Sequence, residues 1–492
     1  MKKYQLFING EIKASGSNKY FDAVNPSDGE VFAQVADATV ADMKTAIEVA
    51  RASFDHGAWS RLSVKERGKY LISIAQKIRE YSKELAELET LDVGKTTKHA
   101  TFIDVPTCAD TFEYFGNIAL DLEKEINVAA PVKSTLLREP VGVVGCIIPW
   151  NYPLIMFGWK VAPALIAGNT VIFKPSSQAS VSTARLAEII NETGLPKGVF
   201  NFITSRDHNV TAELISSTLV DKISFTGGTE TGKEVMRFAA LNTKKLTLEL
   251  GGKSPNIVFA DCDFDAALGG TMSAIFMNQG QMCTAGSRLL LEDKIYDKFL
   301  LALVERTKKL KVGDARDYST DFGPLANEQQ LQNVLNFVQK GSAQGAKLMC
   351  GGKRAVVQGR EKGFYIEPTI FADVDNSMAI AQEEIFGPVL AVIKFSGEDE
   401  AVKIANDTKF GLAACVWSRD LDKANRVAKK IKAGTVWVNT YGGFYNEAPF
   451  GGYKQSGMGR ELGLEGLFEY TQVKHVCVDK TPGGMPLAAS WF

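Results

Sequence analysis

The sequence predicts an α/β protein with two parallel-sheet α/β domains and a small β arm outside them. From Val141 onward, strand-like and helix-like segments alternate about every 25 residues, which is typical of βαβ units in a parallel sheet. Several strand segments are apolar without alternation, as expected of strands buried on both faces. The segment 470–478 instead alternates polar and apolar residues, which predicts an exposed strand.

Length and composition favour an ordinary multidomain globular protein. The chain has 492 residues, too many for one hydrophobic core, with 45% hydrophobic and 23% charged residues. A net charge of −1 argues against nucleic acid or an acidic membrane as a partner. The longest apolar stretch, 141–150, is about half a membrane span, and the N-terminus lacks a signal-peptide pattern. We expect a cytoplasmic protein without a membrane partner.

The first half of the chain predicts helices, an edge strand pair and then a nucleotide-type sheet. Helical periodicity covers 60–90 and about 105–120, and an alternating pattern with Pro131 inside it covers 126–139. Strands are predicted at 141–150, 169–175, 198–204, 222–227 and 246–250, with helices at 153–167 and 180–193. Parallel sheets bind ligands at the carboxyl ends of their strands. The candidate ligand positions are therefore 149–151, 174–177 and 226–228.

A second α/β block is predicted over about 252–450. Its strands are expected at 287–292, 365–371, 389–395, 413–418 and 435–439. Two glycine-rich turns, 449–452 and 456–459, follow them. The alternating tail strand then predicts an edge that pairs with another strand.

Cysteine and histidine usage argues against disulfides and metal. The seven cysteines include no C-x-x-C pair, and the four histidines form no H-E-x-x-H pattern. G-G-T-E-T-G-K-E at 227–234 resembles the start of a phosphate-binding P-loop, but Glu234 stands where Ser or Thr would hold magnesium. The glycine-rich helix start still offers backbone N–H groups to a dinucleotide phosphate, although no G-x-G-x-x-G follows any strand.

Cys283 is the candidate nucleophile. It lies in N-Q-G-Q-M-C-T-A-G-S-R, a turn between a helical segment at 274–278 and a strand from Ser287. Structural cysteines usually lie inside apolar runs, as Cys146 and Cys415 do, whereas glycine and glutamine flank Cys283. A structural thiol remains the alternative at this point.

Two further residues could complete a reaction. Glu249 lies among leucines at the end of a predicted strand, where desolvation should raise its pKa and suit it as a general base. A solvated residue at the strand end is the alternative. Asn151 follows the first strand, where its amide could stabilise an oxyanion or simply form a turn before Tyr152-Pro153.

Seven motifs in one order resemble the aldehyde dehydrogenase superfamily, over residues 1 to about 480. They are P-W-N, K-P-S-S, F-T-G-G-T, L-E-L-G-G-K-S-P-N, G-Q-M-C, E-E-I-F-G-P and P-F-G-G-Y-K-Q-S-G-M-G-R-E. The resemblance implies oxidation of an aldehyde to its carboxylic acid. Cys283 would form a thiohemiacetal and then a thioester, Asn151 and the Cys283 N–H would hold the oxyanion, and Glu249 would activate water.

The resemblance also implies a domain organisation. The Rossmann-like NAD(P)-binding domain would comprise 1–120 and 141–251, and the catalytic domain 252–452. The segments 121–140 and 468–492 would form an oligomerisation arm, giving a homodimer or homotetramer. A non-catalytic relative would be expected to lack Cys283 or Glu249, and a CoA-acylating relative to lack the base at 249; both residues are present.

NAD or NADP is the cofactor that the resemblance implies. The residues expected to bind it are Ile148, Pro149, Trp150, Lys174, Ser176, Ser177, Gly227, Gly228, Leu250, Glu384 and Phe386. NAD-preferring members usually carry Glu at the position of Ser177, where an acid repels the 2′-phosphate of NADP. We therefore expect NADP to be accepted and even preferred, with Lys174 supplying charge. Gly228 replaces a common Ser, so one side-chain contact with the pyrophosphate is lost.

The aldehyde tunnel is expected to be apolar and rich in aromatic residues. By resemblance it is lined by Tyr152, Phe157, Trp159, Met277, Met282, Thr284, Phe444 and Phe450. Trp159 stands where acid-binding semialdehyde members carry Arg. Tyr152 and Trp159 fit the aromatic cage of betaine-aldehyde or amino-aldehyde members, but Met277 and Phe450 stand where Trp is expected. An aromatic or medium-chain aliphatic aldehyde is favoured, with broad specificity as the alternative.

Overall fold

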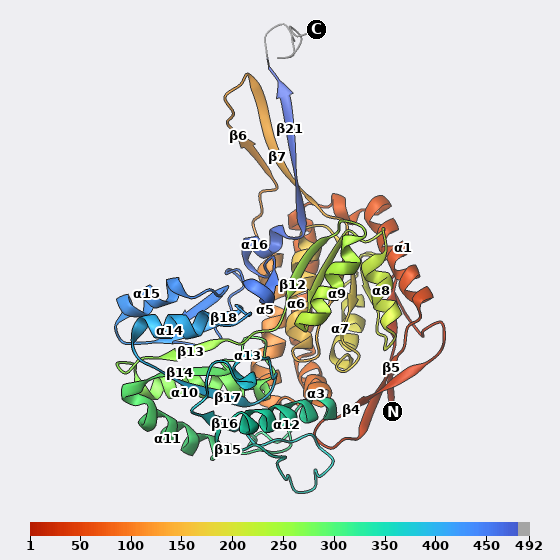
Figure 1. Cartoon of the computed structure of the whole chain (residues 1–492). Coiled ribbons are helices and arrows are strands. Elements are labelled where there is room, and N and C mark those ends of the chain that lie inside the picture. Colours follow the sequence, from red (N-terminus) through yellow and green to blue (C-terminus); the bar gives the residue numbers. More distant parts are fainter. Residues whose placement is uncertain (481–492) are drawn as a thin grey trace.

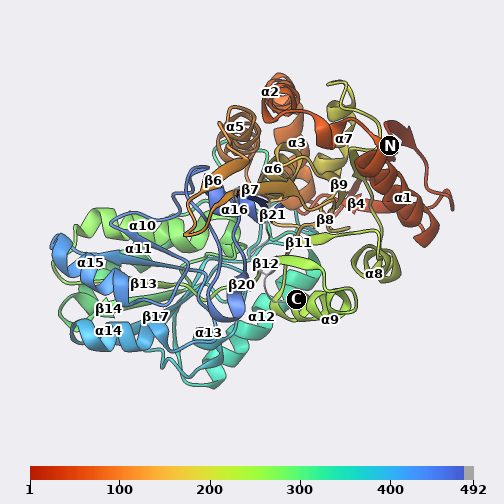
Figure 2. The same cartoon turned by 90° about the horizontal axis from the view of Figure 1, so that it is seen from above.

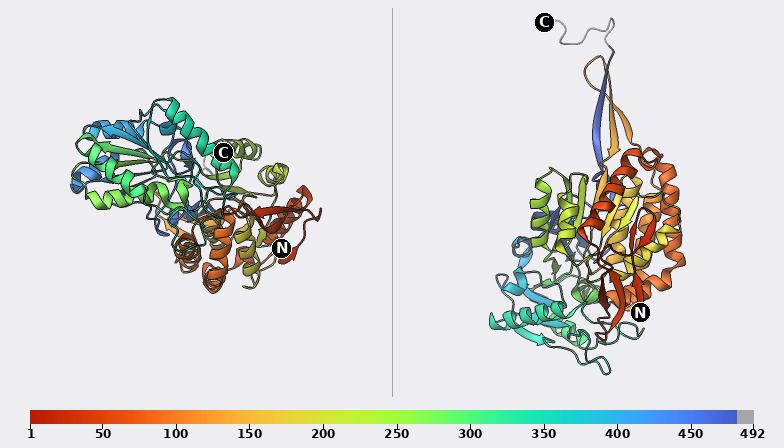
Figure 3. Two further views of the ribbon diagram at one scale, coloured as in Figure 1. Left: turned by 90° about the horizontal axis from the view of Figure 1, so that it is seen from below. Right: turned by 90° about the vertical axis from the view of Figure 1, so that its right-hand side faces the viewer.

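The computed structural model describes residues 1–480 and has the predicted α/β architecture. Two α/β lobes lie side by side, one built mainly from the first half of the chain and the other from residues after 252 (Figure 2). A narrow β arm projects away from both lobes (Figure 1; Figure 3, right). No helix in residues 1–480 is long and apolar enough to cross a membrane.

The first lobe is organised around an eight-stranded sheet within residues 1–480, in the order β20-β12-β11-β8-β9-β10-β2-β3. Its parallel strands are β8 (Val143–Ile147), β9 (Thr170–Lys174), β10 (Phe200–Phe202), β11 (Lys222–Thr226) and β12 (Lys245–Glu249). Antiparallel strands extend both ends, namely β2 (Leu6–Ile8), β3 (Glu11–Lys13) and β20 (Gly457–Met458). Every residue of β8, β9 and β11 is buried, which explains their unalternating sequences.

The second lobe carries a seven-stranded sheet in the same described range, ordered β15-β16-β17-β14-β13-β18-β19. The strands are β13 (Pro255–Val258), β14 (Arg288–Glu292), β15 (Lys347–Cys350), β16 (Thr369–Ala372), β17 (Val389–Phe395), β18 (Ala413–Trp417) and β19 (Thr435–Val438). All neighbours are parallel except β15 with β16. The carboxyl ends of β8, β11 and β12 in the first sheet lie near Cys283, in the turn that precedes β14 of the second sheet.

Two small sheets lie outside the lobes. The arm joins β6 (Glu123–Ile126), β7 (Val132–Pro140) and β21 (Thr471–Asp479), with β21 antiparallel to β7 along its whole length. A terminal sheet joins β1 (Lys2–Tyr4), β4 (Tyr20–Val24) and β5 (Val31–Ala36). Residues 481–492, which we assigned to the arm from the sequence, lie outside the described residues.

Helices cover the sheets. In the first lobe they are α1 (Val40–His56), α2 (Val64–Glu80), α3 (Ser82–Val93), α4 (Thr97–His99), α5 (Val105–Gly116), α6 (Pro153–Ile166), α7 (Val181–Asn191), α8 (His208–Ser216), α9 (Thr229–Ala240) and α16 (Gly463–Phe468). In the second they are α10 (Phe264–Phe276), α11 (Tyr296–Thr307), α12 (Glu328–Ala343), α13 (Ala379–Gln382), α14 (Gly397–Asn406) and α15 (Leu421–Lys430). A π-helical turn at Ala100–Asp104 joins α4 to α5.

Several predicted boundaries are wrong, for local reasons. The helix predicted over 60–90 breaks at Tyr81, whose ψ of 16° leaves the helical region. The strand predicted at 365–371 begins only at Thr369, because Pro368 has no N–H for the ladder. Pro131 lies in the turn between β6 and β7 rather than inside a strand. The helix predicted to reach 278 ends at Phe276.

Candidate active site

Two cavities meet at Cys283. One, of about 260 Å³, lies at the carboxyl edge of the first sheet, and the other, of about 200 Å³, has mostly apolar walls. We call them the sheet-edge cavity and the apolar cavity. Besides Cys283, both are lined by Tyr152 and Met156. A thiol at this junction can react with a molecule in one cavity while a second molecule occupies the other.

Cys283 lies in surroundings that disfavour its thiolate form. It follows a kinked turn, Met277–Gly280, and precedes β14, so its side chain reaches the cavities from a loop. Burial raises its pKa to about 12, and the nearby carboxyls of Glu249 and Glu384 raise it further, while backbone N–H groups oppose the shift. Nucleophilic attack therefore needs a group that takes the thiol proton.

Glu249 is a buried carboxyl close enough to Cys283 to raise the pKa of its thiol. It ends β12, is 3% exposed, and neither carboxyl oxygen has a hydrogen-bond partner among the described residues. Burial raises its pKa well above the usual value, and Glu461 adds to this, while Lys160 and Arg460 oppose it. The glycine-rich turn makes room for it, because a Cβ at Gly451 would lie 2.8 Å from Glu249 Oε1.

Asn151 faces the sheet-edge cavity from the loop after β8. Its Nδ2 donates a hydrogen bond to the Gln281 carbonyl at 2.8 Å, two residues before Cys283. That bond uses one N–H of the amide and leaves the second for a ligand. The structure thus brings Cys283, Glu249 and Asn151 together from separate segments of the chain.

The sheet-edge cavity presents glycine backbone and hydroxyl groups to a ligand. Its walls include most of the expected cofactor residues, namely Pro149, Trp150, Gly227, Gly228, Leu250, Glu384 and Phe386. Gly228 precedes α9 without a capping side chain, and a Cβ there would meet nothing within 4 Å. The buried hydroxyls of Thr226 and Thr229 have no partner among the described residues. A phosphate at this helix start would satisfy such donors.

Glu384 places a carboxyl in the wall of the sheet-edge cavity. Its Oε1 accepts a hydrogen bond from the Gly252 N–H at 3.0 Å. Burial raises its pKa to about 7, although the Gly252 N–H and Lys253 oppose that shift. Close approach requires glycine at 251, because a Cβ there would lie 2.1 Å from Glu384 Oε2. The Phe386 ring packs edge-on against Trp150 at 5.2 Å.

Four expected cofactor residues do not line this cavity. Ile148, Lys174, Ser176 and Ser177 lie at the ends of β8 and β9, where the Ile148 N–H donates to the Lys174 carbonyl at 3.2 Å. Lys174 Nζ donates to the Pro175 carbonyl at 3.3 Å. Burial lowers the pKa of Lys174 to about 8, with Asp37 opposing the shift. These residues extend the strand edge beyond the cavity.

The apolar cavity contains every expected tunnel residue except Phe157. The Phe157 ring instead packs in the core against Phe112, Phe173 and Phe200, so that assignment is wrong. Helical geometry explains the error, since positions 152, 155, 156 and 159 share one face of α6 and 157 points away. The same spacing would have identified Ile155 and Met156, which the sequence analysis missed.

Sequence reasoning also missed a second wall of the apolar cavity. Ile103 and Thr107, from the π-helical turn and α5, lie on it, as does Gly442. Behind them Lys95 is fully buried, 2.7 Å from Asp104 and 3.2 Å from Glu89, with its Nζ 4.1 Å from the Tyr152 ring centre. Three charges spread over 16 residues give no sequence signal for such a cluster.

Comparison with known proteins agrees with the family resemblance seen in the sequence. The model of the aldehyde dehydrogenase family matches residues 12–476. The chain is 46% identical to betaine aldehyde dehydrogenase of Bacillus subtilis (strain 168) over 490 residues, covering 99% of each. It is 44% identical to retinal dehydrogenase 2 of Homo sapiens, covering 97% of this chain and 92% of that protein.

Solved structures agree as well. Betaine aldehyde dehydrogenase from Staphylococcus aureus, in complex with NAD+, matches with a TM-score of 0.96 at 42% identity, covering 99% of this chain and 97% of that one. The fold and the family model define an oxidoreductase that acts on aldehydes. The chain belongs to the aldehyde dehydrogenase family, so the resemblance seen in the sequence is confirmed.

Proposed function

We propose that this enzyme oxidises an apolar aldehyde to its carboxylic acid with NAD or NADP. The observation that carries the proposal is the position of Cys283, which faces the glycine-rich sheet edge on one side and the apolar cavity on the other. The residues 1–120 and 141–251 would hold the cofactor, and 252–452 would supply the nucleophile. A family relative from Staphylococcus aureus binds NAD+.

Cys283, Glu249 and Asn151 have different roles in the proposed reaction. Glu249 takes the thiol proton, and the Cys283 sulfur bonds to the aldehyde carbon. The second N–H of Asn151 and the Cys283 N–H stabilise the resulting oxyanion. NAD(P), when bound, supplies the hydride acceptor. Loss of hydride from the adduct carbon to that acceptor leaves a thioester on Cys283, and Glu249 releases the thiol proton to solvent. Glu249 then removes a proton from water, whose oxygen attacks the thioester carbon and displaces the sulfur as a thiolate. The carboxylic acid leaves, and the proton on Glu249 restores the thiol.

Two variants test these roles. We expect Cys283→Ser to abolish turnover. Because Glu249 acts in both half-reactions, Glu249→Gln should give a single, slowed round of NAD(P)H formation followed by an accumulated thioester. Stopped-flow absorbance measures the first round, and mass spectrometry of the intact protein detects the acyl group. Normal turnover by Cys283→Ser would overturn the mechanism.

The substrate class follows from the apolar cavity. Of the residues that line it, none carries a charged side chain, and Tyr152, Trp159, Phe444 and Phe450 supply aromatic surface. Phe444 packs against Trp159 at 5.6 Å and Phe450 at 5.3 Å, which leaves a closed aromatic wall. We propose an aromatic or medium-chain aliphatic aldehyde, with broad specificity because apolar pockets discriminate weakly per methylene.

Betaine aldehyde is the second candidate. Two observations favour it: the similarity to betaine aldehyde dehydrogenases and the Tyr152 and Trp159 rings in the cavity. Measured kcat/KM for betaine aldehyde, an amino-aldehyde, phenylacetaldehyde, hexanal and an acidic semialdehyde separates the classes. We expect the two apolar substrates to exceed betaine aldehyde; the reverse order would assign the enzyme to the cationic class.

NADP use is the finer part of the cofactor proposal. Ser177, half-buried after β9, offers a hydroxyl where an acid would repel the 2′-phosphate, and Lys174 lies three residues earlier. We expect kcat/KM for NADP to equal or exceed that for NAD, and Ser177→Glu to reverse the order. A preference of the native enzyme for NAD of about 100-fold or more, on the order of 3 kcal/mol, would contradict this.

Hydrolysis rather than acyl transfer to CoA is expected, because Glu249 is buried beside Cys283. Free acid should remain the product when CoA is added. An acyl-CoA product would support the CoA-acylating alternative, and absence of turnover across the whole aldehyde panel would support a non-catalytic one.

A further inference from the structure

Asn278 has a strained backbone and lies just before the nucleophile. It and Gln279 adopt left-handed conformations, with φ of 48° and 56°, and are 3% and 2% exposed. Asn tolerates this region better than most residues, and Gln tolerates it poorly. Buried strain of this kind persists only where surrounding contacts hold it, and such sites cluster around reaction centres.

The Asn278 amide ties two segments together. Its Nδ2 donates to the Asn151 carbonyl at 3.1 Å and to the Gln281 carbonyl at 3.3 Å. Gln281 returns two bonds to the Asn278 carbonyl, from its backbone N–H at 3.0 Å and from Nε2 at 3.1 Å. Because Asn151 Nδ2 also donates to the Gln281 carbonyl, the three residues form a closed hydrogen-bonded ring.

This ring fixes how the Asn151 amide is turned. Because the Gln281 carbonyl accepts a hydrogen bond, the Asn151 atom that faces it must be Nδ2 and not Oδ1. The second N–H of Asn151 therefore keeps one direction in the sheet-edge cavity. Asn278 also lies beside the Tyr152 hydroxyl: burial raises the pKa of Tyr152 well above its usual value, and the Asn278 amide opposes that shift. One side chain thus holds the oxyanion donor, the nucleophile turn and a cavity wall.

We propose that Asn278 is a positioning residue that sets the direction of the Asn151 N–H relative to Cys283. It lines neither of the two cavities that meet at Cys283, so it acts through Asn151 and Gln281 rather than on the substrate. The proposal rests on the proposed oxyanion role of Asn151.

Three variants separate the amide from the backbone. Asn278→Asp keeps the size and the tolerance for positive φ but places an acceptor against two carbonyl oxygens. Asn278→Gly keeps the backbone conformation and removes the amide, and Asn278→Ala loses both. Asn18, which is exposed with a φ of 54°, supplies the matched controls Asn18→Asp and Asn18→Gly.

We expect Asn278→Asp and Asn278→Gly to slow single-turnover NAD(P)H formation by about 10- to 100-fold, within the effect of losing an oxyanion donor. The Kd for the cofactor should change less than about threefold, and the Asn18 variants should behave as the native enzyme. Circular dichroism melting shows whether each variant is folded. If Asn278→Asp is not folded, the rate of Asn278→Gly alone tests the proposal.

A double-mutant cycle with Asn151→Ala distinguishes positioning of the Asn151 amide from a merely structural role of Asn278. The quantity compared is the rate of single-turnover NAD(P)H formation. If Asn278 acts through Asn151, the double variant Asn151→Ala/Asn278→Gly should be no slower than Asn151→Ala alone. Rate losses that multiply in the double variant, or native rates in both Asn278→Asp and Asn278→Gly, would overturn the proposal. A native rate in Asn151→Ala would instead show that the oxyanion role assigned to Asn151 is wrong.

Discussion

Cys283 and Lys174 both lie where burial works against their charged forms. Burial raises the pKa of the Cys283 thiol to about 12 and lowers that of the Lys174 ammonium to about 8. The proposed reaction needs a thiolate, and the proposed NADP preference needs an ammonium. The alkylation rate of Cys283 and the affinity for NADP should therefore each depend on pH, and both can be measured without the complete reaction.

Alkylation of Cys283 tests the state of the resting thiol. Because only the thiolate reacts, its rate with iodoacetamide in cofactor-free protein should rise about tenfold per pH unit from pH 7 to 9, with no plateau. Mass spectrometry of the peptide containing Cys283 separates it from the other cysteines, and N-acetylcysteine gives the curve of an ordinary thiol. A plateau near pH 7 would show that the free enzyme already holds a thiolate.

Lys174 should make NADP binding weaker in alkaline solution. With a pKa of about 8, the Lys174 ammonium would attract a 2′-phosphate below pH 8 and would lose that attraction above it. The ratio of Kd for NADP to Kd for NAD should therefore increase about tenfold between pH 7 and 9. Lys174→Arg, which stays charged, should remove the dependence. A constant ratio in the native enzyme would show that Lys174 does not contact the phosphate.

At the scale of elements, the sequence pattern predicted α6, but the family resemblance assigned Phe157 to the wrong face of it. Phe157 belongs to the core, and Ile155 and Met156 to the cavity, as the helical spacing from Tyr152 and Trp159 requires. The first hairpin had a usable signal as well: Asn9-Gly10, both at positive φ, joins β2 to β3. The three-residue strands around it are too short for a period to appear.

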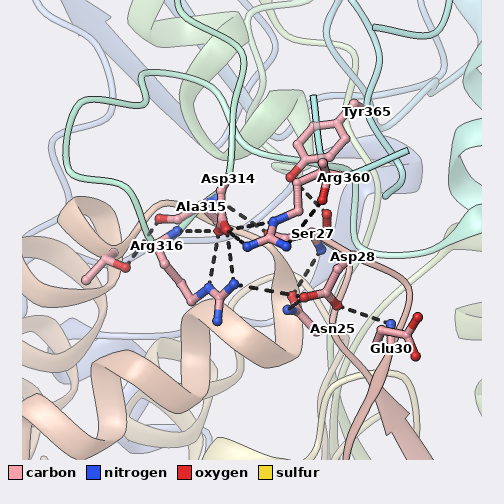
Figure 4. A network of polar contacts seen from close by, with 11 residues as sticks. Asn25, Ser27, Asp28, Glu30, Asp314, Ala315, Arg316, Arg360 and Tyr365 are labelled. Carbon is pink, nitrogen blue, oxygen red and sulfur yellow. Dashed lines mark hydrogen bonds and ion pairs between the residues drawn. The ribbon is translucent and has the colours of Figure 1, made fainter. Parts of the chain in front are cut away.

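A polar network joins the turn between β4 and β5 of the terminal sheet to two loops of the second lobe (Figure 4). Asp314 accepts hydrogen bonds from Arg316 and, at 2.7 and 2.9 Å, from Arg360, while the Tyr365 hydroxyl donates to the Ser27 carbonyl at 3.1 Å. Burial alone would raise the pKa of Asp314, but the two arginines outweigh it and lower the pKa to about 2. The carboxylate form therefore stabilises the fold.

Asp314→Asn should destabilise the protein more at pH 7 than at pH 3, where part of the charge stabilisation is already lost. The stabilisation is complete above the unfolded pKa of about 4 and is lost as pH falls towards 2; after allowance for solvent screening it is about 1–2 kcal/mol. Urea denaturation at pH 7 and at pH 3 measures it, with exposed Asp293→Asn as control. An equal loss at both pH values would show that packing, not charge, explains the effect.

At the scale of the whole molecule, the sequence predicted both central sheets, because buried parallel strands leave long apolar runs. It could not predict how the site closes. Glu249, Cys283 and Glu384 come from three separate segments, and only the folded chain brings the Glu249 and Glu384 carboxyls close enough to raise the pKa of Cys283. The Lys160–Glu461 pair, 2.6 Å apart and buried, joins residues 301 positions apart in the same way.

The projecting arm leads to the last prediction, on assembly. β21 forms one edge of the arm sheet, and all its residues after Thr471 are exposed, including Val476 and Val478 at 38% and 52% (Figure 3, right). A long exposed edge strand favours pairing with a second strand, so we expect a homodimer or homotetramer held by paired arms.

Val476→Glu/Val478→Glu would place like charges together across such a pair and should lower the mass measured by light scattering. Val356→Glu, at a loop residue that is 91% exposed, is the control and should leave the mass unchanged. A monomeric native protein, or an unchanged mass in the double variant, would show that the arm does not hold the assembly.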